Sequence, residues 1–148
     1  MAGEGPSSCV FCQIIAGTSP SAKVYEDEKV LAFMNLQQKN PGHILVVPKE
    51  HHRNIYDINE DTAAEVARVA VRLARAIKAA YRPDGMNSLQ NSEPAAMQSI
   101  FHYHLHLIPR YRGDDLFAIF KAPPASQGEL KANAEKIKQA LQTGPGPV

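Results

Sequence analysis

The chain has 148 residues, the usual size of a single domain. Its 16 basic and 15 acidic residues give a formal net charge of +1, which argues against the basic surface of a general nucleic-acid binder. No apolar run approaches the roughly 20 residues that a membrane helix needs, and residues 1–8 lack the features of a signal peptide, so a cytoplasmic protein is expected.

The apolar periodicity predicts one α+β domain over residues 9–142, between disordered tails at 1–8 and 143–148. In chain order the expected elements are a short helix at 9–16 ended by Gly17, strands at 23–27, 30–35 and 44–47, a long helix at 61–81, strands at 85–90 and 100–109, and a peripheral helix at 129–142. Asn59 or Asp61 can cap the long helix, which ends at Arg82-Pro83. Strands around one long helix indicate an antiparallel sheet with helices on one face.

Three histidines alternate in the segment His102-Tyr103-His104-Leu105-His106. Successive side chains of a strand point to opposite faces, so the three imidazoles are expected on one face and Tyr103 and Leu105 on the other. Imidazole serves as nucleophile, proton carrier or metal ligand near neutral pH. One histidine on an apolar strand is usually a core residue, but three in strict alternation indicate a functional site.

The spacing of the three imidazoles suits phosphoryl chemistry. Alternate residues of a strand lie about 6.5–7 Å apart, so one imidazole can meet a phosphorus atom while its neighbours reach other oxygens of the substrate. The middle residue, His104, is the natural nucleophile for in-line attack on an α-phosphate, after which water hydrolyses the nucleotidyl-histidine. His106 would donate to a phosphoryl oxygen, and a nearby carbonyl would hold the other ring N–H of His104 and fix its tautomer.

Two cysteines, Cys9 and Cys12, have the spacing Cys-x2-Cys. In a cytosolic chain this spacing indicates a zinc or redox site before a disulfide, with buried inert thiols as the alternative. A thioredoxin-like role would need a βαβ unit, which the predicted elements lack. A structural zinc site would need two further ligands.

Residues 102–108, His-Tyr-His-Leu-His-Leu-Ile, resemble the pattern His-φ-His-φ-His-φ-φ (φ, hydrophobic) of the histidine triad (HIT) nucleotide hydrolases and transferases. The resemblance covers about residues 9–112 and includes Phe11, Ile14-Ile15, 30–33, 41–49 and 87–89. It implies a HIT-like fold, with a five-stranded antiparallel sheet, one long helix and one or two short ones.

The resemblance also implies a homodimer, in which a strand and the long helix join two sheets into one of ten strands. Small residues on the 61–81 helix would permit close approach of two copies: Ala63, Ala64, Ala67, Ala70, Ala74 and Ala76. The segment 110–120 would then reach the active site of the partner.

The implied activity is hydrolysis at the α-phosphate of a purine nucleotide derivative, such as a nucleoside phosphoramidate or a dinucleoside polyphosphate. His104 would be the nucleophile, assisted by His43, His106 and His102. The implied nucleotide contacts are Asn91, Gln98 and Ser99 at the phosphate or leaving group, Asn35 at the ribose, and Phe11, Ile14, Phe33 and Leu36 in an apolar slot that stacks the base without reading its edge. Taken singly, these polar residues suit a surface turn and the apolar ones a core.

Members of the family with an N-terminal Cys-x2-Cys imply the two missing metal ligands. By this resemblance Cys9, Cys12, His51 and His102 would hold a structural zinc ion. His52 is the rival of His51, but it would point to the opposite face of an extended segment.

One segment departs from the family pattern. Relatives usually carry a Gly-rich turn ending Ala-Gly-Gln before the triad, whereas this chain has Ser92-Glu-Pro-Ala-Ala-Met-Gln98. Met97 in place of glycine removes freedom for positive φ, and Glu93 adds negative charge near a substrate phosphate, so slow turnover or an unusual leaving group is expected.

Three alternatives remain open from the sequence. The first is a nucleotide-binding protein with weak or no turnover. The second is a nucleotidyltransferase, in which glutamine typically occupies the position of His106. The third is a mononuclear metalloenzyme that uses His102, His104 and His106 together as ligands.

Overall fold

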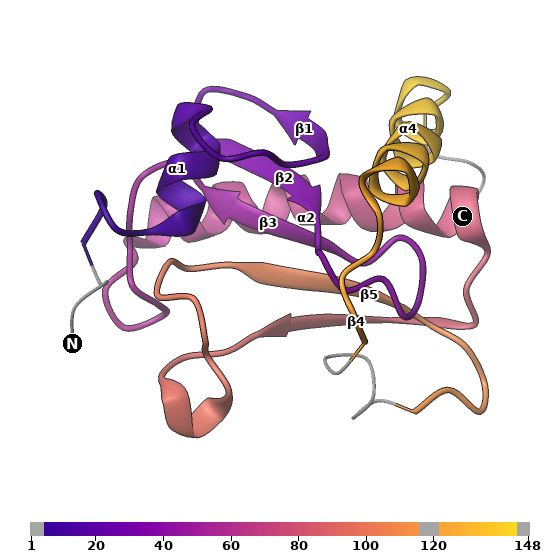
Figure 1. The fold of residues 1–148 in the computed structure, drawn as a ribbon. Coiled ribbons are helices and arrows are strands. Elements are labelled where there is room, and N and C mark those ends of the chain that lie inside the picture. Colours follow the sequence, from indigo (N-terminus) through magenta and orange to yellow (C-terminus); the bar gives the residue numbers. More distant parts are fainter. Residues whose placement is uncertain (1–4, 116–121, 145–148) are drawn as a thin grey trace.

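The structure is a computed structural model, which describes residues 5–115 and 122–144 (Figure 1). Its elements are α1 (Val10–Ala16), β1 (Lys23–Glu26), β2 (Val30–Met34), β3 (Ile44–Pro48), α2 (Glu60–Tyr81), β4 (Gly85–Gln90), the 3-10 turn η1 (Pro94–Ala96), β5 (Leu105–Arg110) and α4 (Gln127–Gln142). The expected tails at 1–8 and 143–148 fall partly outside the described residues, as does the second half of the segment 110–120.

The five strands form one sheet in the order β1-β2-β3-β5-β4, and all neighbours are antiparallel. The central strands β2 and β3 are buried at every position, because both faces of the sheet are covered. Successive residues alternate between the two faces, so Ala32 and Val46 enter one core and Leu31 and Val47 the other. The expected antiparallel α+β architecture is confirmed.

The helices lie on both faces of the sheet, not on one as the sequence predicts (Figure 1). The larger core packs α2 and α4 against one face, where Leu73, Ile77 and Ile137 are fully buried. The smaller core packs Phe11 and Ile14 of α1 against the other face. A seven-residue helix with two inward residues gives little periodicity, so its side of the sheet could not be read from the sequence.

The capping residues explain where the helices begin and end. Asn59 caps α2 by accepting from the Thr62 N–H at 2.8 Å, and Gly17 ends α1 in the left-handed conformation. The last helix starts two residues before the predicted 129, because Ser126 and Glu129 form a reciprocal capping box. This helix is not peripheral, since Leu130, Ala134 and Ile137 are part of the core.

The predicted strand at 100–109 is wrong over its first half. Hydrogen-bonded pairing begins only at Leu105, so His102 and His104 precede β5 in an extended loop. Within the described ranges, no helix combines the length and apolar character needed to cross a membrane.

Candidate functional site

The three triad histidines share one face of the chain although only His106 lies within a strand. The Phe11 ring packs edge-on against the rings of His102 and His104, at centroid distances of 5.9 and 5.1 Å. Tyr103 and Leu107 point the other way, into the core under α2. The extended backbone therefore keeps the period of two that the sequence indicates, without the hydrogen-bond ladder.

The tautomer of His104 is fixed by its own backbone. Nδ1 of His104 lies 2.7 Å from the carbonyl oxygen of His102. A carbonyl oxygen can only accept, so Nδ1 carries the proton and Nε2 keeps its lone pair. Burial lowers the pKa of His104, which favours the neutral ring. His104 thus has the form that a nucleophilic imidazole requires.

A second hydrogen-bonded chain joins three residues beside His104. The side-chain amide of Asn35 lies 3.4 Å from Nδ1 of His43, and Nε2 of His43 lies 2.9 Å from Nδ1 of His106. If the amide donates to His43, then His43 donates to His106, and the proton of His106 is on its Nε2. His43 reaches His106 because Leu45, two residues later in β3, is the cross-strand partner of His106.

Burial keeps this chain of imidazoles neutral. It lowers the pKa of His43 to about 4 and that of His106 to about 3, with the charges of His104 and His43 adding to the second shift. Near pH 7 each ring is therefore neutral and holds one proton, so it can relay a proton by accepting one at one nitrogen while it donates the other.

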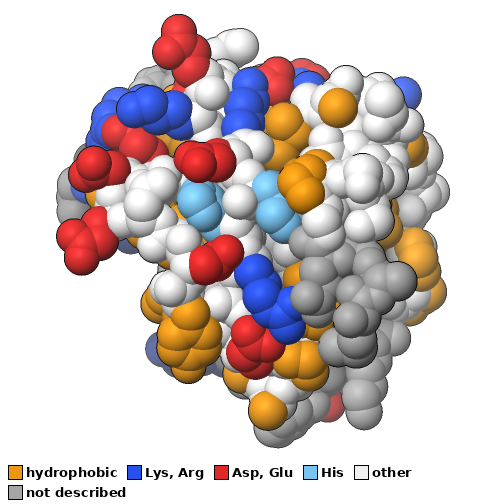
Figure 2. Space-filling model, turned by 90° about the vertical axis from the view of Figure 1, so that its left-hand side faces the viewer, with side chains coloured by type: hydrophobic (Ala, Val, Ile, Leu, Met, Phe, Trp, Pro, Cys, Tyr) orange, Lys and Arg blue, Asp and Glu red, His pale blue; other side chains and the backbone are white. Residues whose placement is uncertain are grey.

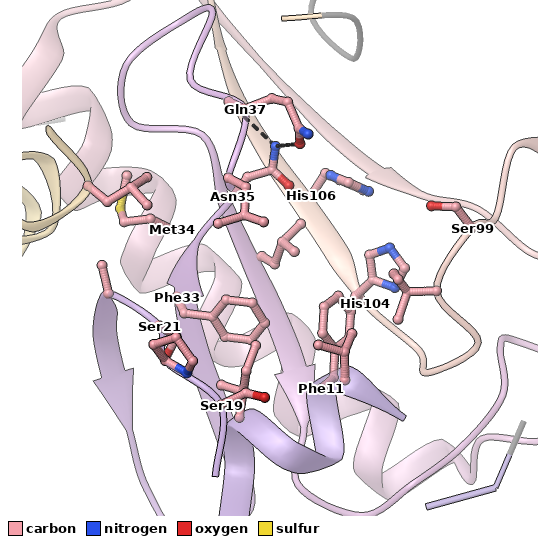
Figure 3. A pocket seen from close by; sticks show the side chains of 18 of the residues that line it. Phe11, Ser19, Ser21, Phe33, Met34, Asn35, Gln37, Ser99, His104 and His106 are labelled. Carbon is pink, nitrogen blue, oxygen red and sulfur yellow. Dashed lines mark hydrogen bonds between the residues drawn. The ribbon is translucent and has the colours of Figure 1, made fainter. Parts of the chain in front are cut away.

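A pocket of about 580 Å³ opens beside these histidines (Figure 3). His104, His106 and Ser99 lie at one end, whereas Phe33, Ser19 and Ser21 lie toward the other. The structure brings together nine predicted site residues around it: Phe11, Ile14, Phe33, Asn35, Leu36, Asn91, Ser99, His104 and His106. The Phe11 and Phe33 rings meet edge to face at 5.3 Å and give the pocket an apolar wall.

Three residues predicted for catalysis or nucleotide binding, Gln98, His43 and His102, are buried and do not line the pocket. The Gln98 amide donates to the carbonyl of Arg53 at 2.7 Å and accepts from the Glu93 N–H at 2.8 Å. The predicted contact of Gln98 with the nucleotide does not fit this position, because its side chain already holds the loop before the triad. His43 contacts two residues that line the pocket, Asn35 and His106.

The negative charge that Glu93 was expected to add near a substrate phosphate is paired with the charge of Arg53. Its carboxylate is bound by Arg53, at 3.0 and 2.7 Å, and by the Asn54 amide at 2.7 Å. These hydrogen bonds, that of Arg53 above all, lower the pKa of Glu93 to about 2. The sequence did not indicate the role of Arg53 as the partner of Glu93, because a single arginine in a loop has no pattern that shows which residue it binds.

Gly42 positions His43 through a backbone conformation that suits only glycine. Its φ is +99°, and an added Cβ would lie 2.9 Å from the Tyr81 ring. The ring has little room to move, because its hydroxyl donates to the Asn133 side chain at 2.9 Å.

Gly42→Ala is therefore expected to lower the free energy of unfolding by about 1–3 kcal/mol. Denaturant unfolding followed by circular dichroism measures this loss. Gly128→Ala in α4 is the matched control, since its nearest neighbour would be 3.9 Å away and alanine suits a helix better. Equal stability of the Gly42 variant and the wild type would contradict the close packing.

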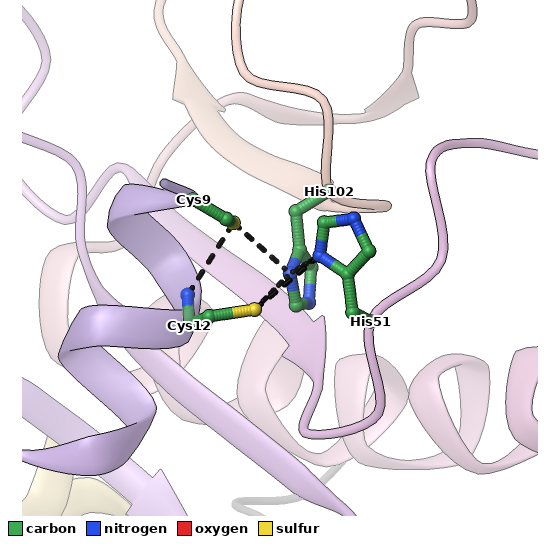
Figure 4. Close-up of side chains that lie close together, drawn as sticks. All are labelled: Cys9, Cys12, His51 and His102. Carbon is green, nitrogen blue, oxygen red and sulfur yellow. Dashed lines mark hydrogen bonds between the residues drawn. The ribbon is translucent and has the colours of Figure 1, made fainter. Parts of the chain in front are cut away.

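A second cluster lies on the other side of the triad (Figure 4). The ligand atoms of Cys9, Cys12, His51 and His102 all lie within 4.8 Å of one another. Nδ1 of His102 is 3.4 Å from the Cys9 sulfur and 3.2 Å from Nδ1 of His51, and the Cys12 sulfur is 3.3 Å from Nδ1 of His51. Cys9 caps α1, so the turn of the helix brings the two thiols to one side.

The cluster fits a tetrahedral zinc ion. Bond lengths near 2.05 Å to nitrogen and 2.3 Å to sulfur place tetrahedral ligand atoms about 3.3–3.8 Å apart, close to the distances found. Nε2 of His102 donates to the carbonyl of Pro48 at 2.7 Å, which leaves Nδ1 unprotonated and directed at the cysteines. His52 is directed elsewhere, with its Nε2 3.5 Å from the Glu50 carboxylate.

This geometry does not favour a metal held by the three triad histidines together. His102 directs its ligand nitrogen toward the cysteines, while Nδ1 of His104 is engaged by a carbonyl. In the described part of the chain, the Cys9–Cys12–His51–His102 cluster is the group whose ligand atoms are gathered for a metal.

Residues 16–113 match the family model described as HIT domain. The chain belongs to the HIT family. It is 49% identical over 115 residues to "Protein hit" of Bacillus subtilis, covering 77% of this chain and 79% of the relative. It is 31% identical over 136 residues to "Adenosine 5'-monophosphoramidase hnt1" of Schizosaccharomyces pombe, covering 91% and 99% of the two chains.

A solved HIT structure matches the fold. A zinc-bound histidine triad family protein from Mycobacterium smegmatis superposes with a TM-score of 0.81 at 35% identity, covering 94% of this chain and 96% of that one. The sheet and helices described above are therefore those of a HIT protein.

The HIT pocket also contains side chains that the sequence did not single out. Ser19, Ser21, Gln37 and Gln127 line it and place polar groups beside the apolar wall. Ser19 donates to the Gln13 side chain at 3.1 Å. Gln127 comes from the first turn of α4, more than 100 residues from Ser19, and no local pattern connects the two.

Figure 2 shows histidine side chains reaching the surface on the face that lies at the left of Figure 1. Acidic and basic side chains are interspersed around them, so neither sign of charge dominates this face. Such a surface suits a small ligand bound in a pocket better than a polyanion lying across it.

Proposed function

We propose that this HIT protein hydrolyses purine nucleotide derivatives at the α-phosphate, through a nucleotidyl-histidine formed on His104. The observation that carries the proposal is the fixed tautomer of His104, whose unprotonated Nε2 belongs to a ring that lines the pocket. The name of the fission yeast relative, an adenosine 5'-monophosphoramidase, supports a nucleoside phosphoramidate as substrate.

In the first step Nε2 of His104 forms a bond to the α-phosphorus and the bond from phosphorus to the leaving amine breaks. The amine takes the Nε2 proton of His106, which in turn takes the proton of His43 at its Nδ1, so the chain carries one negative charge until the second step. In the second step water attacks the phosphorus, its proton returns to that chain, and the bond to His104 breaks. Nucleoside monophosphate and the free, neutral His104 are the products.

The nucleoside half would occupy the rest of the pocket. The base would stack on the apolar wall of Phe11, Ile14, Phe33 and Leu36, which accepts either adenine or guanine by its π-face. Asn35 lines the pocket, where its amide can bind the ribose hydroxyls, and Asn91 and Ser99 would contact the phosphate or leaving group.

Zinc would be held by Cys9, Cys12, His51 and His102, with all four positions filled by protein. A closed site of this kind contributes folding free energy and not an activated water. The carbonyl of His102 holds the nucleophile, so the cluster would steady the part of the backbone that fixes the tautomer of His104. A reducing cytoplasm would keep the two thiols available as ligands.

A quench experiment with adenosine 5'-phosphoramidate tests the mechanism. Protein denatured in acid-free quench during turnover should carry an AMP adduct on the peptide that contains His104, detected by mass spectrometry. Activity should survive a chelator that does not remove the cluster metal. Turnover without any adduct would refute the covalent route.

We also propose a homodimer joined through β4 and α2. The strand β4 forms one edge of the sheet and is poorly buried along its length, which leaves backbone groups to be paired. Ala64, Ala67 and Val71 lie on the exposed side of α2, whereas Ala70 and Ala76 of the predicted small-residue set face the chain's own core.

Light scattering at micromolar concentration should give twice the chain mass of 16.2 kDa. Val71→Lys should shift the protein toward the monomer, because it places a charge in the apolar contact. Ile55→Lys is the control, since Ile55 is similarly exposed, at 55% against 50%, but belongs to neither β4 nor α2. A monomeric wild type would contradict the dimer.

A further inference from the structure

The turn before the triad holds two residues in a conformation that usually requires glycine. Glu93 has φ 74° and ψ 156°, and Met97 has φ 70° and ψ 21°. The first lies in a region that is almost confined to glycine, and the second is left-handed. Such backbone strain persists only where surrounding contacts enforce it, and it often marks a functional segment.

The enforcing contacts are specific side-chain bonds. Arg53 binds the Glu93 carboxylate through two nitrogens, and its guanidinium stacks on the Phe101 ring at 4.3 Å. Gln98 accepts from the Glu93 N–H at 2.8 Å. Hydrogen bonds of Glu93 and Gln98 thus hold both ends of the turn, and they fix the backbone of Met97 between them.

Although these bonds fix the backbone of Met97, its side chain is largely exposed to solvent. It is 66% exposed and it lines the pocket together with Asn91 and Ser99. Ser99, two residues after Met97, stands at the histidine end of the pocket, away from Phe33 of the wall proposed for the base (Figure 3). With the phosphorus beside His104 and the nucleoside toward Phe33, the leaving group must lie on the remaining side of the phosphorus, and the turn that carries Met97 leads directly into Ser99 at this end.

We infer that Met97 is a specificity-determining residue, whose thioether side chain packs on an apolar substituent of the leaving amine. The inference rests on the proposed function and adds to it the class of leaving group. A flexible, polarisable methionine adapts to alkyl groups of different shape, and covering it would remove exposed apolar surface from water. Nucleoside phosphoramidates of alkylamines are then better substrates than the unsubstituted phosphoramidate.

Two substrates with the same AMP half test this: adenosine 5'-phosphoramidate and its N-butyl derivative. The ratio of their kcat/KM values is the readout, because effects on the shared nucleotide half cancel. Met97→Gly should lower the preference for the butyl compound by about tenfold, the effect of one or two packed methylene groups. Met97→Leu should keep most of the preference, and Ala95→Gly in the same turn should leave it unchanged.

The outcomes separate the two proposals. A wild-type protein that hydrolyses neither compound overturns the proposed function and this inference with it. A wild-type protein that hydrolyses both, with the same ratio in Met97→Gly, overturns the role of Met97 alone. Thermal melting of each variant checks folding, and glycine suits the left-handed position of Met97 better than methionine does.

Discussion

Replacing His104 with alanine is expected to lower kcat for adenosine 5'-phosphoramidate by at least about 10³-fold, or ~4 kcal/mol in the barrier. His104 is the residue whose Nε2 lone pair is fixed by the hydrogen bond from Nδ1 to the His102 carbonyl. Without it no bond to phosphorus can form, and direct attack by water is the remaining route. AMP binding should persist, because Asn35, Phe33 and Ser99 still line the pocket.

Steady-state kinetics measure the loss of kcat, and calorimetric titration with AMP measures whether nucleotide binding persists. His104→Gly with added imidazole is the companion variant, since a free imidazole that fits the space can restore part of the turnover. A His104→Ala protein that retains kcat within about tenfold of the wild type would show that His104 is not the nucleophile. A loss of AMP binding would show instead that the variant has damaged the pocket.

The double variant Cys9→Ser/Cys12→Ser is expected to lose about one zinc ion per chain and about 4 kcal/mol of stability. A ligand that binds only the folded state, present at 1,000 times its Kd, stabilises that state by about this amount. The thiolates come from α1 and the imidazoles of His51 and His102 from two other segments, so the metal joins parts of the chain that are distant in sequence. Elemental analysis and denaturant unfolding of tag-free protein make the measurement.

Two adjacent histidines give a sharper control. His51→Ala should lose the metal, whereas His52→Ala should keep it, because the His52 ring faces Glu50 and not the cysteines. A wild-type protein without metal, as stable as the double cysteine variant, would rule out the structural zinc.

The sequence determined the face of the triad because that property is local. A period of two follows from the covalent geometry of any extended backbone, so the orientation of His104 and His106 holds even where β5 has not yet begun. The capping box of Ser126 and Glu129 was equally local, and the start of α4 could have been read from it.

Loop side chains were predicted less well, because a loop has no period that tells where a side chain points. Gln98 was expected at the phosphate, yet its amide is used inside the loop. Glu93 was expected to add negative charge near a substrate phosphate, yet Arg53, forty residues earlier, pairs with its carboxylate. These partners are fixed by packing, and the sequence alone does not show which of them come together.

The sequence by itself determined which groups are candidates for the chemistry: three alternating imidazoles and a Cys-x2-Cys pair. Only the tertiary structure decided which nitrogen of each imidazole is protonated and where the other nitrogen points. The Nδ1 proton of His104 is set by a carbonyl, and His102 is directed to the cysteines by its hydrogen bond to Pro48, 54 residues away. A tautomer depends on which acceptor lies within about 3 Å, and that distance exists only after the chain has folded.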